Sequence, residues 1–252
     1  MTASIPSLDD IRRDIDRIDD AILALLAERA LATTRVRARK SRDGSIAASP
    51  IRPAREAIIL RRLIAKRSAD IHPETVVRLW RGILVSSTLS QAPVRLHLCG
   101  ASLDERLALR DHFGPMAVVQ HQNVVAVLAA LKENSGDIAA LCAGAEWAVE
   151  IALRRTGARA IAALPCLGGG AAPSLLIFGL APMQPSGDDV TLLIGALGNK
   201  LPMGLTARWQ WRSGDYQVLA LNGFLTDSEL LPLLKTAGYF NLAGRYPAPI
   251  EV

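Results

Sequence analysis

The sequence has few aromatic residues and few cysteines. Aromatic side chains make up 4% of its 252 residues, and three cysteines cannot form the disulfide framework of a small secreted scaffold. The first twenty residues carry several acids and no apolar stretch of the signal-peptide type. The longest uncharged run, residues 160–187, contains four prolines and three successive glycines, which favours strands and loops over a membrane helix. We therefore expect a soluble, cytoplasmic protein without a membrane partner.

Glycine and aromatic residues are scarcest in the first 93 residues, which contain two glycines and one aromatic residue. The same block holds 17 Lys and Arg against 11 Asp and Glu, whereas the rest of the chain holds 12 against 13. Half of all residues are hydrophobic, which is enough for a core in one large or two modest domains. The shift in composition predicts an all-helical domain over residues 1–92 and an α/β domain over residues 94–252.

Helical periodicity runs through the N-terminal block. Ser7 precedes two acids and is a suitable N-cap, and apolar residues then recur three or four positions apart, without Gly or Pro over residues 8–40. This pattern predicts one helix of about 33 residues, roughly 50 Å long. A helix of that length needs a partner along its whole length. A second helix is predicted after residues 50–53, running to about residue 67, and a third begins at Pro73 and ends near residue 91.

Several polar side chains of this block are spaced so that they can converge. Arg29 lies beside the apolar stripe of the long helix, and Lys40 follows eleven residues later on nearly the same face. Ser87 and Gln91 are four residues apart and share a face of the third helix. Cationic side chains with uncharged polar partners are typical of a pocket for a small dianion, because guanidinium groups bind carboxylates in a forked geometry.

Three stretches within residues 7–92, namely LDDIRRDIDRIDDAILALLAERALA, PIRPARE and SSTLSQ, resemble the all-helical chorismate mutase family. The family has an early Arg in the first helix, a leucine-rich stretch ending in Glu-Arg, and a Lys eleven residues on. An Arg-Glu begins the second helix, and Ser-x-x-x-Gln lies on the third. The matching positions are Arg12, Arg29, Lys40, Arg55, Glu56, Ser87 and Gln91. The sequence departs from the family at Pro53, where an Asp usually follows the loop arginine.

The resemblance implies rearrangement of chorismate to prephenate in phenylalanine and tyrosine biosynthesis. This pericyclic reaction forms no covalent intermediate with the enzyme. The enzyme must hold a flexible dianion in a compact conformer and stabilise charge that builds on the ether oxygen. The roles that the resemblance assigns are carboxylate binding for Arg12, Arg29 and Ser87, donation to the ether oxygen for Lys40 and Gln91, hydroxyl binding for Glu56, and added positive field for Arg55.

Helix geometry adds an expectation about assembly. Arg12 and Arg29 are 17 residues apart in the sequence, which places them roughly 25 Å apart along one helix. A ligand of the size of chorismate cannot contact both side chains within one subunit. We therefore expect an interlocked homodimer in which Arg12 is contributed across the interface. Such a dimer would also give the long helix its partner.

The C-terminal part alternates between strand and helix patterns, which favours a parallel sheet. Strands are expected at residues 94–100, 116–120, 137–142, 174–180 and 189–196, and helices at residues 103–113, 124–132 and 146–155. The tail, residues 215–247, reads as a strand, a helix and a strand in a βαβ unit. Trp209 and Trp211 alternate along a further strand, so both face one side, in the core or in an interface.

Motifs with a chemical role are sparse in this part. The three glycines of residues 168–170 lack the Lys-Ser/Thr of a phosphate-binding loop, and we interpret them as a connector. The histidines lack metalloprotease spacing, and Ser174 has no nucleophile-elbow context. We expect no metal and no cofactor. The cysteines, which are too far apart in the sequence for a zinc motif, are Cys99, Cys142 and Cys166.

The stretches DIAALCAGAEWAVEIA and LAGRYPAPIEV resemble prephenate dehydratase and its attached ACT-type regulatory domain, with the ACT-like part at about residues 186–252. The Thr-Arg-Phe motif of the dehydratase would fall at residues 173–175, which read Pro-Ser-Leu, so its catalytic Thr and Arg are missing. We interpret this part as a degenerate domain without dehydratase activity, retained for stability, dimer contact or effector binding. Binding of an aromatic amino acid as an effector is a hypothesis.

Three other functions stay open at this point. An isochorismate pyruvate-lyase shares the helical fold and the same kind of cationic pocket. A non-catalytic regulatory or binding subunit has no need for a Lys and Gln pair at an ether oxygen. Nucleic-acid binding is suggested only by the sequence pI of about 9.4, and we expect none.

Overall fold

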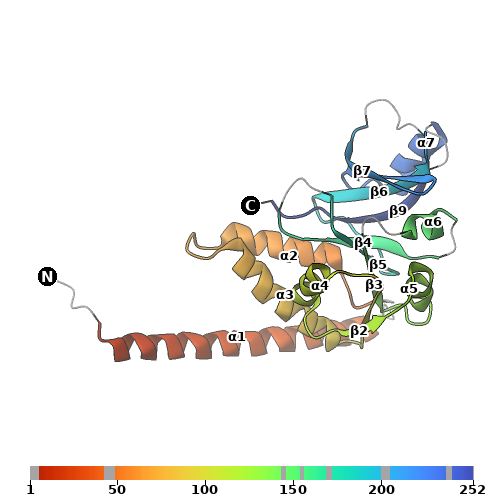
Figure 1. Ribbon diagram of the computed structural model, residues 1–252. Coiled ribbons are helices and arrows are strands. Elements are labelled where there is room, and N and C mark those ends of the chain that lie inside the picture. The colour runs from red at the N-terminus through yellow and green to blue at the C-terminus, as the bar shows by residue number, and fades with distance from the viewer. Residues whose placement is uncertain are drawn as a thin grey trace. The chain divides into compact units, whose positions relative to one another are not determined.

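The computed structural model describes residues 6–42, 49–142, 146–153, 156–168, 172–199, 205–236 and 240–251 (Figure 1). Contacts between Cα atoms divide the chain into two compact units, residues 1–46 and residues 47–252. The domain boundary expected near residue 93 lies inside the second unit and stays a prediction. Within the described residues, no helix combines the length and the apolar character that crossing a membrane requires.

The helices confirm the three that were predicted for the N-terminal part, followed by an α/β part. They are α1 (Leu8–Arg42), α2 (Pro53–Lys66), α3 (Pro73–Leu89), α4 (Leu103–Phe113), α5 (Val124–Ala130), α6 (Trp147–Ala152) and α7 (Asp227–Thr236). Helices α2 and α3 both begin with proline, which lacks the N–H that a first turn leaves unpaired. A capping box between Ser102 and Glu105 fixes the start of α4.

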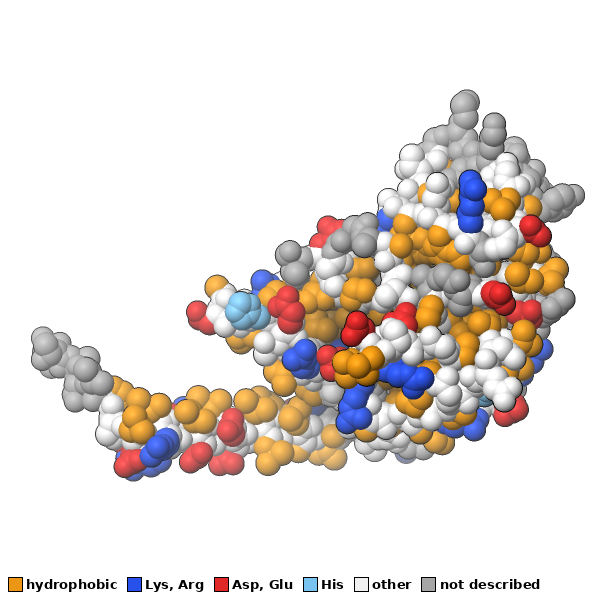
Figure 2. All heavy atoms as spheres, in the orientation of Figure 1, with side chains coloured by type: hydrophobic (Ala, Val, Ile, Leu, Met, Phe, Trp, Pro, Cys, Tyr) orange, Lys and Arg blue, Asp and Glu red, His pale blue; other side chains and the backbone are white. Residues whose placement is uncertain are grey.

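Helix α1 is unbroken over 35 residues. It exposes a set of large apolar side chains that alternate at spacings of three and four, and Figure 2 shows apolar side chains along its surface. Such spacing is typical of the contact seam of a coiled coil. We call this set the α1 apolar stripe: Leu8, Ile11, Ile15, Ile18, Ile22 and Leu25, each 44% to 65% exposed.

In the part of the chain that the structure describes, nine strands form one sheet in the order β2-β1-β3-β5-β4-β9-β6-β8-β7. The strands are β1 (Arg95–Leu98), β2 (Ala117–Gln120), β3 (Ile138–Cys142), β4 (Arg159–Leu164), β5 (Leu175–Gly179), β6 (Asp189–Ala196), β7 (Ala207–Ser213), β8 (Tyr216–Asn222) and β9 (Phe240–Pro247). The expectation of a parallel sheet is wrong: among the described strands, the pairs β1–β2, β1–β3 and β4–β9 are parallel and the other pairs are antiparallel. Strand β5 runs antiparallel to both β3 and β4, which makes the sheet mixed.

The predicted βαβ tail is present as β8, α7 and β9, but β6 lies between the two strands and pairs with both. The sheet is joined across its middle where Ala160 of β4 lies opposite Gly244 of β9. A side chain at residue 244 would collide with the backbone of Ala160. Glycine is therefore required at this point of close approach.

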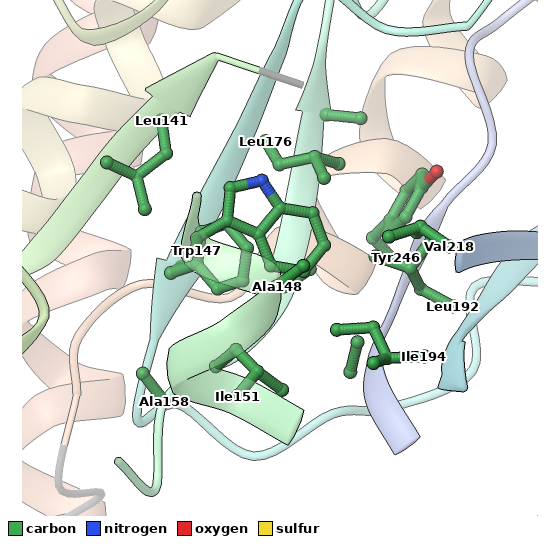
Figure 3. Packing of buried hydrophobic residues seen from close by; sticks show 14 of the residues in the cluster. Leu141, Trp147, Ala148, Ile151, Ala158, Leu176, Leu192, Ile194, Val218 and Tyr246 are labelled. Carbon is green, nitrogen blue, oxygen red and sulfur yellow. The ribbon is translucent and has the colours of Figure 1, made fainter. Parts of the chain in front are cut away.

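One face of the sheet carries the core around Trp147 of α6, which is fully buried. Figure 3 shows its indole among side chains of several strands, including Leu141, Leu176 and Tyr246. Trp211 packs edge-on against Trp147 with ring centroids 5.4 Å apart, and Trp209 is buried in the same cluster. The expected placement of the two tryptophans in a core is thus confirmed.

The other face is covered by α3 and α4, whose side chains Val85, Leu109 and Phe113 pack with Leu96 and Ile177 of the strands. Helix α2 contacts α3 and β9, and a smaller cluster joins these helices to Ile250. Helices α2 and α3 are therefore part of the compact unit that contains the sheet.

Candidate active site

Three of the predicted site residues lie on α1. Arg12 is exposed and pairs with Asp9, with Nη1 and Oδ1 3.3 Å apart. Arg29 is half-buried, and burial lowers the pKa of its guanidinium group. Lys40 lies in the last turns of the helix, but its side chain is outside what the structure describes. Because α1 is continuous, Arg12 and Arg29 are separated by their full helical distance within one chain.

Two predicted residues meet at the end of α3. The hydroxyl of Ser87 donates to the carbonyl oxygen of Ile83 at 2.9 Å. The side-chain amide of Gln91 donates to the carbonyl oxygen of Ser87, also at 2.9 Å. This contact is consistent with the predicted shared face. The amide nitrogen of Gln91 carries a second hydrogen, which can serve another acceptor.

Arg55 and Glu56 lie in the first turn of α2, where Arg55 is exposed and Glu56 is mostly buried. The Oε2 atom of Glu56 accepts a hydrogen bond from Nη1 of Arg81 on α3, at 2.5 Å. In the described part of the chain, no hydrogen bond joins Glu56 to Ser87 or Gln91. Within α2, α3 and the residues after α3, the described hydrogen bonds thus join Ser87 to Gln91, and Glu56 to Arg81.

Arg81 was not among the residues that sequence reasoning selected. Its side chain is 5% exposed, and its Nε atom donates to the carbonyl oxygen of His112 at 3.0 Å. Its guanidinium carbon lies 5.7 Å from the centre of the Phe113 ring. A signal was present, because Arg81 precedes the buried Leu84 and Val85 by three and four residues and so lies on the buried face of α3.

A small cavity of about 50 Å³ lies beside this ion pair. Most of its wall is apolar, from helices α2 and α4 and from strands of the sheet, and its charged lining residues are Glu56 and Arg81. His112 also borders it, and burial, followed by the nearby charge of Arg81, lowers the pKa of this histidine well below 6.5. The ion pair is therefore enclosed by neutral surroundings.

A second polar cluster, also missed from the sequence, lies at β1. The imidazole of the buried His97 is bonded to Asp137 at 3.0 Å and to His121 at 2.8 Å. Arg95 and Asn134 donate to the same carboxylate, which is fully buried. Burial opposes the charged form of Asp137, but hydrogen bonds from His97 and Arg95 outweigh it and lower the pKa of this carboxyl. No spacing rule links residues this far apart in sequence.

The remaining candidates of the α/β part have structural partners. The hydroxyl of Ser174 donates to the carbonyl oxygen of Leu164 at 3.3 Å. The three cysteines are free and partly buried. Burial, followed by a hydrogen bond with Glu105, raises the pKa of Cys142 to about 11, so this thiol is protonated at neutral pH. Gly169 and Gly170 lie outside the described residues.

Among the described residues, no group of three or more His, Cys, Asp and Glu side chains is arranged to hold a metal ion. The structure supplies cationic and hydrogen-bonding side chains on α1, α2 and α3 instead. Such groups can bind a carboxylate-bearing ligand and stabilise developing negative charge.

Comparison with known families identifies the N-terminal part of the chain. Residues 11–92 match the family model of chorismate mutase type II. This match confirms the resemblance predicted for residues 7–92, and it includes all seven predicted site positions. The N-terminal helical part is thus a chorismate mutase type II region. No curated protein matches the chain.

The solved structures that match part of this chain include two prephenate dehydratases. The Streptococcus mutans enzyme is 14% identical, with a TM-score of 0.42, and the match covers 63% of this chain and 99% of that one. The enzyme of Staphylococcus aureus subsp. aureus Mu50 is 10% identical, with a TM-score of 0.38 and coverages of 60% and 99%. GqqA, described as a novel type of quorum quenching acylase, is 16% identical, with a TM-score of 0.42 and coverages of 61% and 95%.

Proposed function

We propose that the protein is a chorismate mutase, an isomerase that converts chorismate to prephenate. The observation that carries the proposal is the chorismate mutase type II match over residues 11–92. The seven family positions inside that range support it further, because each has the residue type that the reaction needs. The reaction is a single rearrangement, so the residues act by binding, orientation and charge stabilisation.

We assign the substrate contacts as follows. Arg29 binds one carboxylate, and its guanidinium group remains cationic in the neutral pH range. Lys40 and Gln91 donate to the ether oxygen, where negative charge develops as the C–O bond breaks. Since Gln91 does not titrate, its donor persists at any pH near neutrality. Ser87 assists a carboxylate and Arg55 adds positive field.

The α1 apolar stripe supports the proposal of a homodimer, since six large apolar side chains at coiled-coil spacing are exposed in the single chain. Arg12 would then reach the site of the partner subunit. If so, Arg12→Ala and Arg29→Ala chains, each inactive, should complement each other, because a mixed dimer contains one site with both arginines. Random re-assembly should restore about a quarter of the wild-type activity. Absence of any recovery, with mixed dimers verified by mass, would contradict the exchange of Arg12.

We further propose that the α/β part lacks dehydratase activity. Residues 173–175 do not supply a Thr-Arg pair, and the hydroxyl of Ser174 is bonded to the backbone. The decisive experiment follows chorismate, prephenate and phenylpyruvate separately with the full-length protein. We expect chorismate to be consumed and prephenate to accumulate without phenylpyruvate. Unchanged chorismate would refute the mutase, and phenylpyruvate formation would refute the inactive dehydratase.

A further inference from the structure

Arg81 of α3 connects Glu56, a predicted mutase residue, with the end of α4, because it forms an ion pair with Glu56 and also contacts α4. Glu56 is assigned to the substrate hydroxyl, while Arg81 belongs to no family position. The side chains of Glu56 and Arg81 are 15% and 5% exposed, so the contact between them is largely shielded from screening ions while part of Glu56 stays exposed. Their hydrogen bond is charge-assisted at both ends, which makes it stronger than a neutral one.

Arg81 is itself held from the other side. Its Nε atom donates to the carbonyl oxygen of His112, and its guanidinium group lies near the ring of Phe113. Both residues are at the end of α4, which packs against β1 in the core of the α/β part. The position of the guanidinium group is therefore set by backbone and ring atoms of α4, and not by Glu56 alone.

One carboxylate oxygen of Glu56, Oε1, is available to a further hydrogen-bond donor. Oε2 is bound to Arg81, whereas Oε1 has no hydrogen-bond partner among the described residues. Nor is Oε1 among the fully buried polar atoms that lack a partner in the described part of the chain, which are Trp147 Nε1, Trp211 Nε1 and Tyr246 OH. An accessible acceptor with a fixed orientation is what recognition of a hydroxyl group requires.

We infer that Arg81 is a positioning residue for the mutase reaction: it holds Glu56 so that Oε1 can accept a hydrogen bond from the substrate hydroxyl. This inference rests on the proposed function. A free glutamate side chain rotates about three torsions, and Arg81 removes that freedom before substrate binds. Through Arg81, the end of α4 in the α/β part contributes to a reaction whose contacting residues all lie within residues 11–92.

The test compares chorismate with 4-deoxychorismate, which lacks the hydroxyl, in assays of the full-length protein. Arg81→Met should lower kcat/KM for chorismate by about ten- to a hundredfold, the effect expected when a contacting group is misplaced. With the deoxy analogue, the same substitution should change kcat/KM by less than about threefold. In a Glu56→Ala background, Arg81→Met should have little further effect on either substrate, because the two residues act as a unit.

Arg78→Met is the matched control. Arg78 also lies on α3 and pairs with a residue of α4, Asp111, at 3.4 Å, but it does not contact Glu56. We expect wild-type kinetics with both substrates. Arg81→Lys provides a second variant if Arg81→Met does not fold. It keeps the charge but cannot bond to both Glu56 and His112 in the same way, so it should lose about tenfold on chorismate alone.

Equal losses on chorismate and on the deoxy analogue would show that Arg81 only stabilises the fold, and unchanged kinetics would show no role at all. Either result overturns the inference while leaving the mutase intact. A wild-type protein that does not consume chorismate would instead refute the proposed function.

Discussion

Helix α1 and the sheet both contain large apolar residues, but these side chains are exposed on α1 and buried in the sheet. The stripe of α1 is 44% to 65% exposed, whereas Leu96 and Leu98 of β1 are 1% and 2% exposed. The strands have helices on both faces, so the sheet completes its core within one chain. An isolated helix gains little from its own propensity and needs tertiary contacts to be stable. The comparison shows that the buried apolar core lies within residues 47–252, whereas the α1 apolar stripe is exposed in the single chain.

We expect the largest effect when charged residues replace apolar residues of the α1 apolar stripe. Ile18→Asp with Ile22→Asp should shift the equilibrium from dimer to monomer by at least a thousandfold, because unpaired carboxylates would be buried in an apolar seam. Mutase activity should disappear with the dimer. Analytical ultracentrifugation measures the assembly. Ala27→Asp, on the opposite side of the helix, is the control and should remain dimeric. A dimeric, active double variant would mean that the stripe is not the interface.

Lys40→Ala tests the chemistry assigned to α1. Loss of a donor to a developing oxyanion typically lowers kcat by roughly 10²–10³-fold, and we expect a loss of this size with a smaller change in KM. Arg35→Ala, an exposed cation of the same helix, should leave kcat within about twofold of the wild type because a surface charge contributes little. Steady-state kinetics with chorismate as substrate gives kcat for both variants. Equal kcat values for Lys40→Ala and the wild type would refute its role.

Asp137→Asn tests whether the polar cluster at β1 stabilises the part of the chain that contains the sheet. The substitution weakens the hydrogen bonds from His97 and Arg95 in a fully buried site, and we expect a loss of about 3 kcal/mol in the free energy of unfolding. Urea denaturation followed by circular dichroism measures it. Asp215→Asn, at an exposed turn, should change stability by less than about 0.5 kcal/mol. Similar stabilities for both variants would show that the β1 cluster is not stabilising.

The smallest effect that we expect is the dependence of the free energy of unfolding on pH through His112. The folded chain favours neutral His112, so its folded pKa lies below the unfolded value of 6.5. The contribution of His112 to stability is therefore complete above about pH 6.5 and decreases as the pH falls towards the folded pKa. Between pH 7 and pH 5.5 we expect a loss of about 1 kcal/mol that is smaller in His112→Gln. The exposed His72→Gln should keep the wild-type slope, and identical slopes in all three proteins would contradict the assignment.

Much of the fold was predictable because its signals are local. The predicted start of α1 at residue 8 and its length follow from apolar periodicity and the lack of Gly and Pro, and α4 coincides with its predicted range of residues 103–113. The mixed direction of the sheet was not predictable in this way. A strand pattern such as that of residues 175–179 records burial on both faces but not the direction in which the strand runs between its neighbours.

In the candidate site, too, local spacing could be predicted from the sequence, whereas contacts between distant residues could not. The family positions could be recognised because their spacing is local, as for Ser87 in the last turn of α3 and Gln91 just beyond the end of that helix. Arg81 could not be assigned a partner, because Glu56 is 25 residues away and His112 is 31 residues away in sequence. The same holds for His97 and Asp137, which are 40 residues apart and meet only because β1 and β3 are neighbours.

The sequence by itself therefore determined the helical character of the N-terminal part, its resemblance to the mutase family over residues 11–92 and the apolar periodicity of α1. These depend on spacing along one helix, which local geometry controls. The tertiary structure alone decided the strand order, the attachment of α2 and α3 to the sheet, and the contact of Arg81 with both Glu56 and His112. Such contacts depend on which distant segments pack together, and no local pattern records that choice.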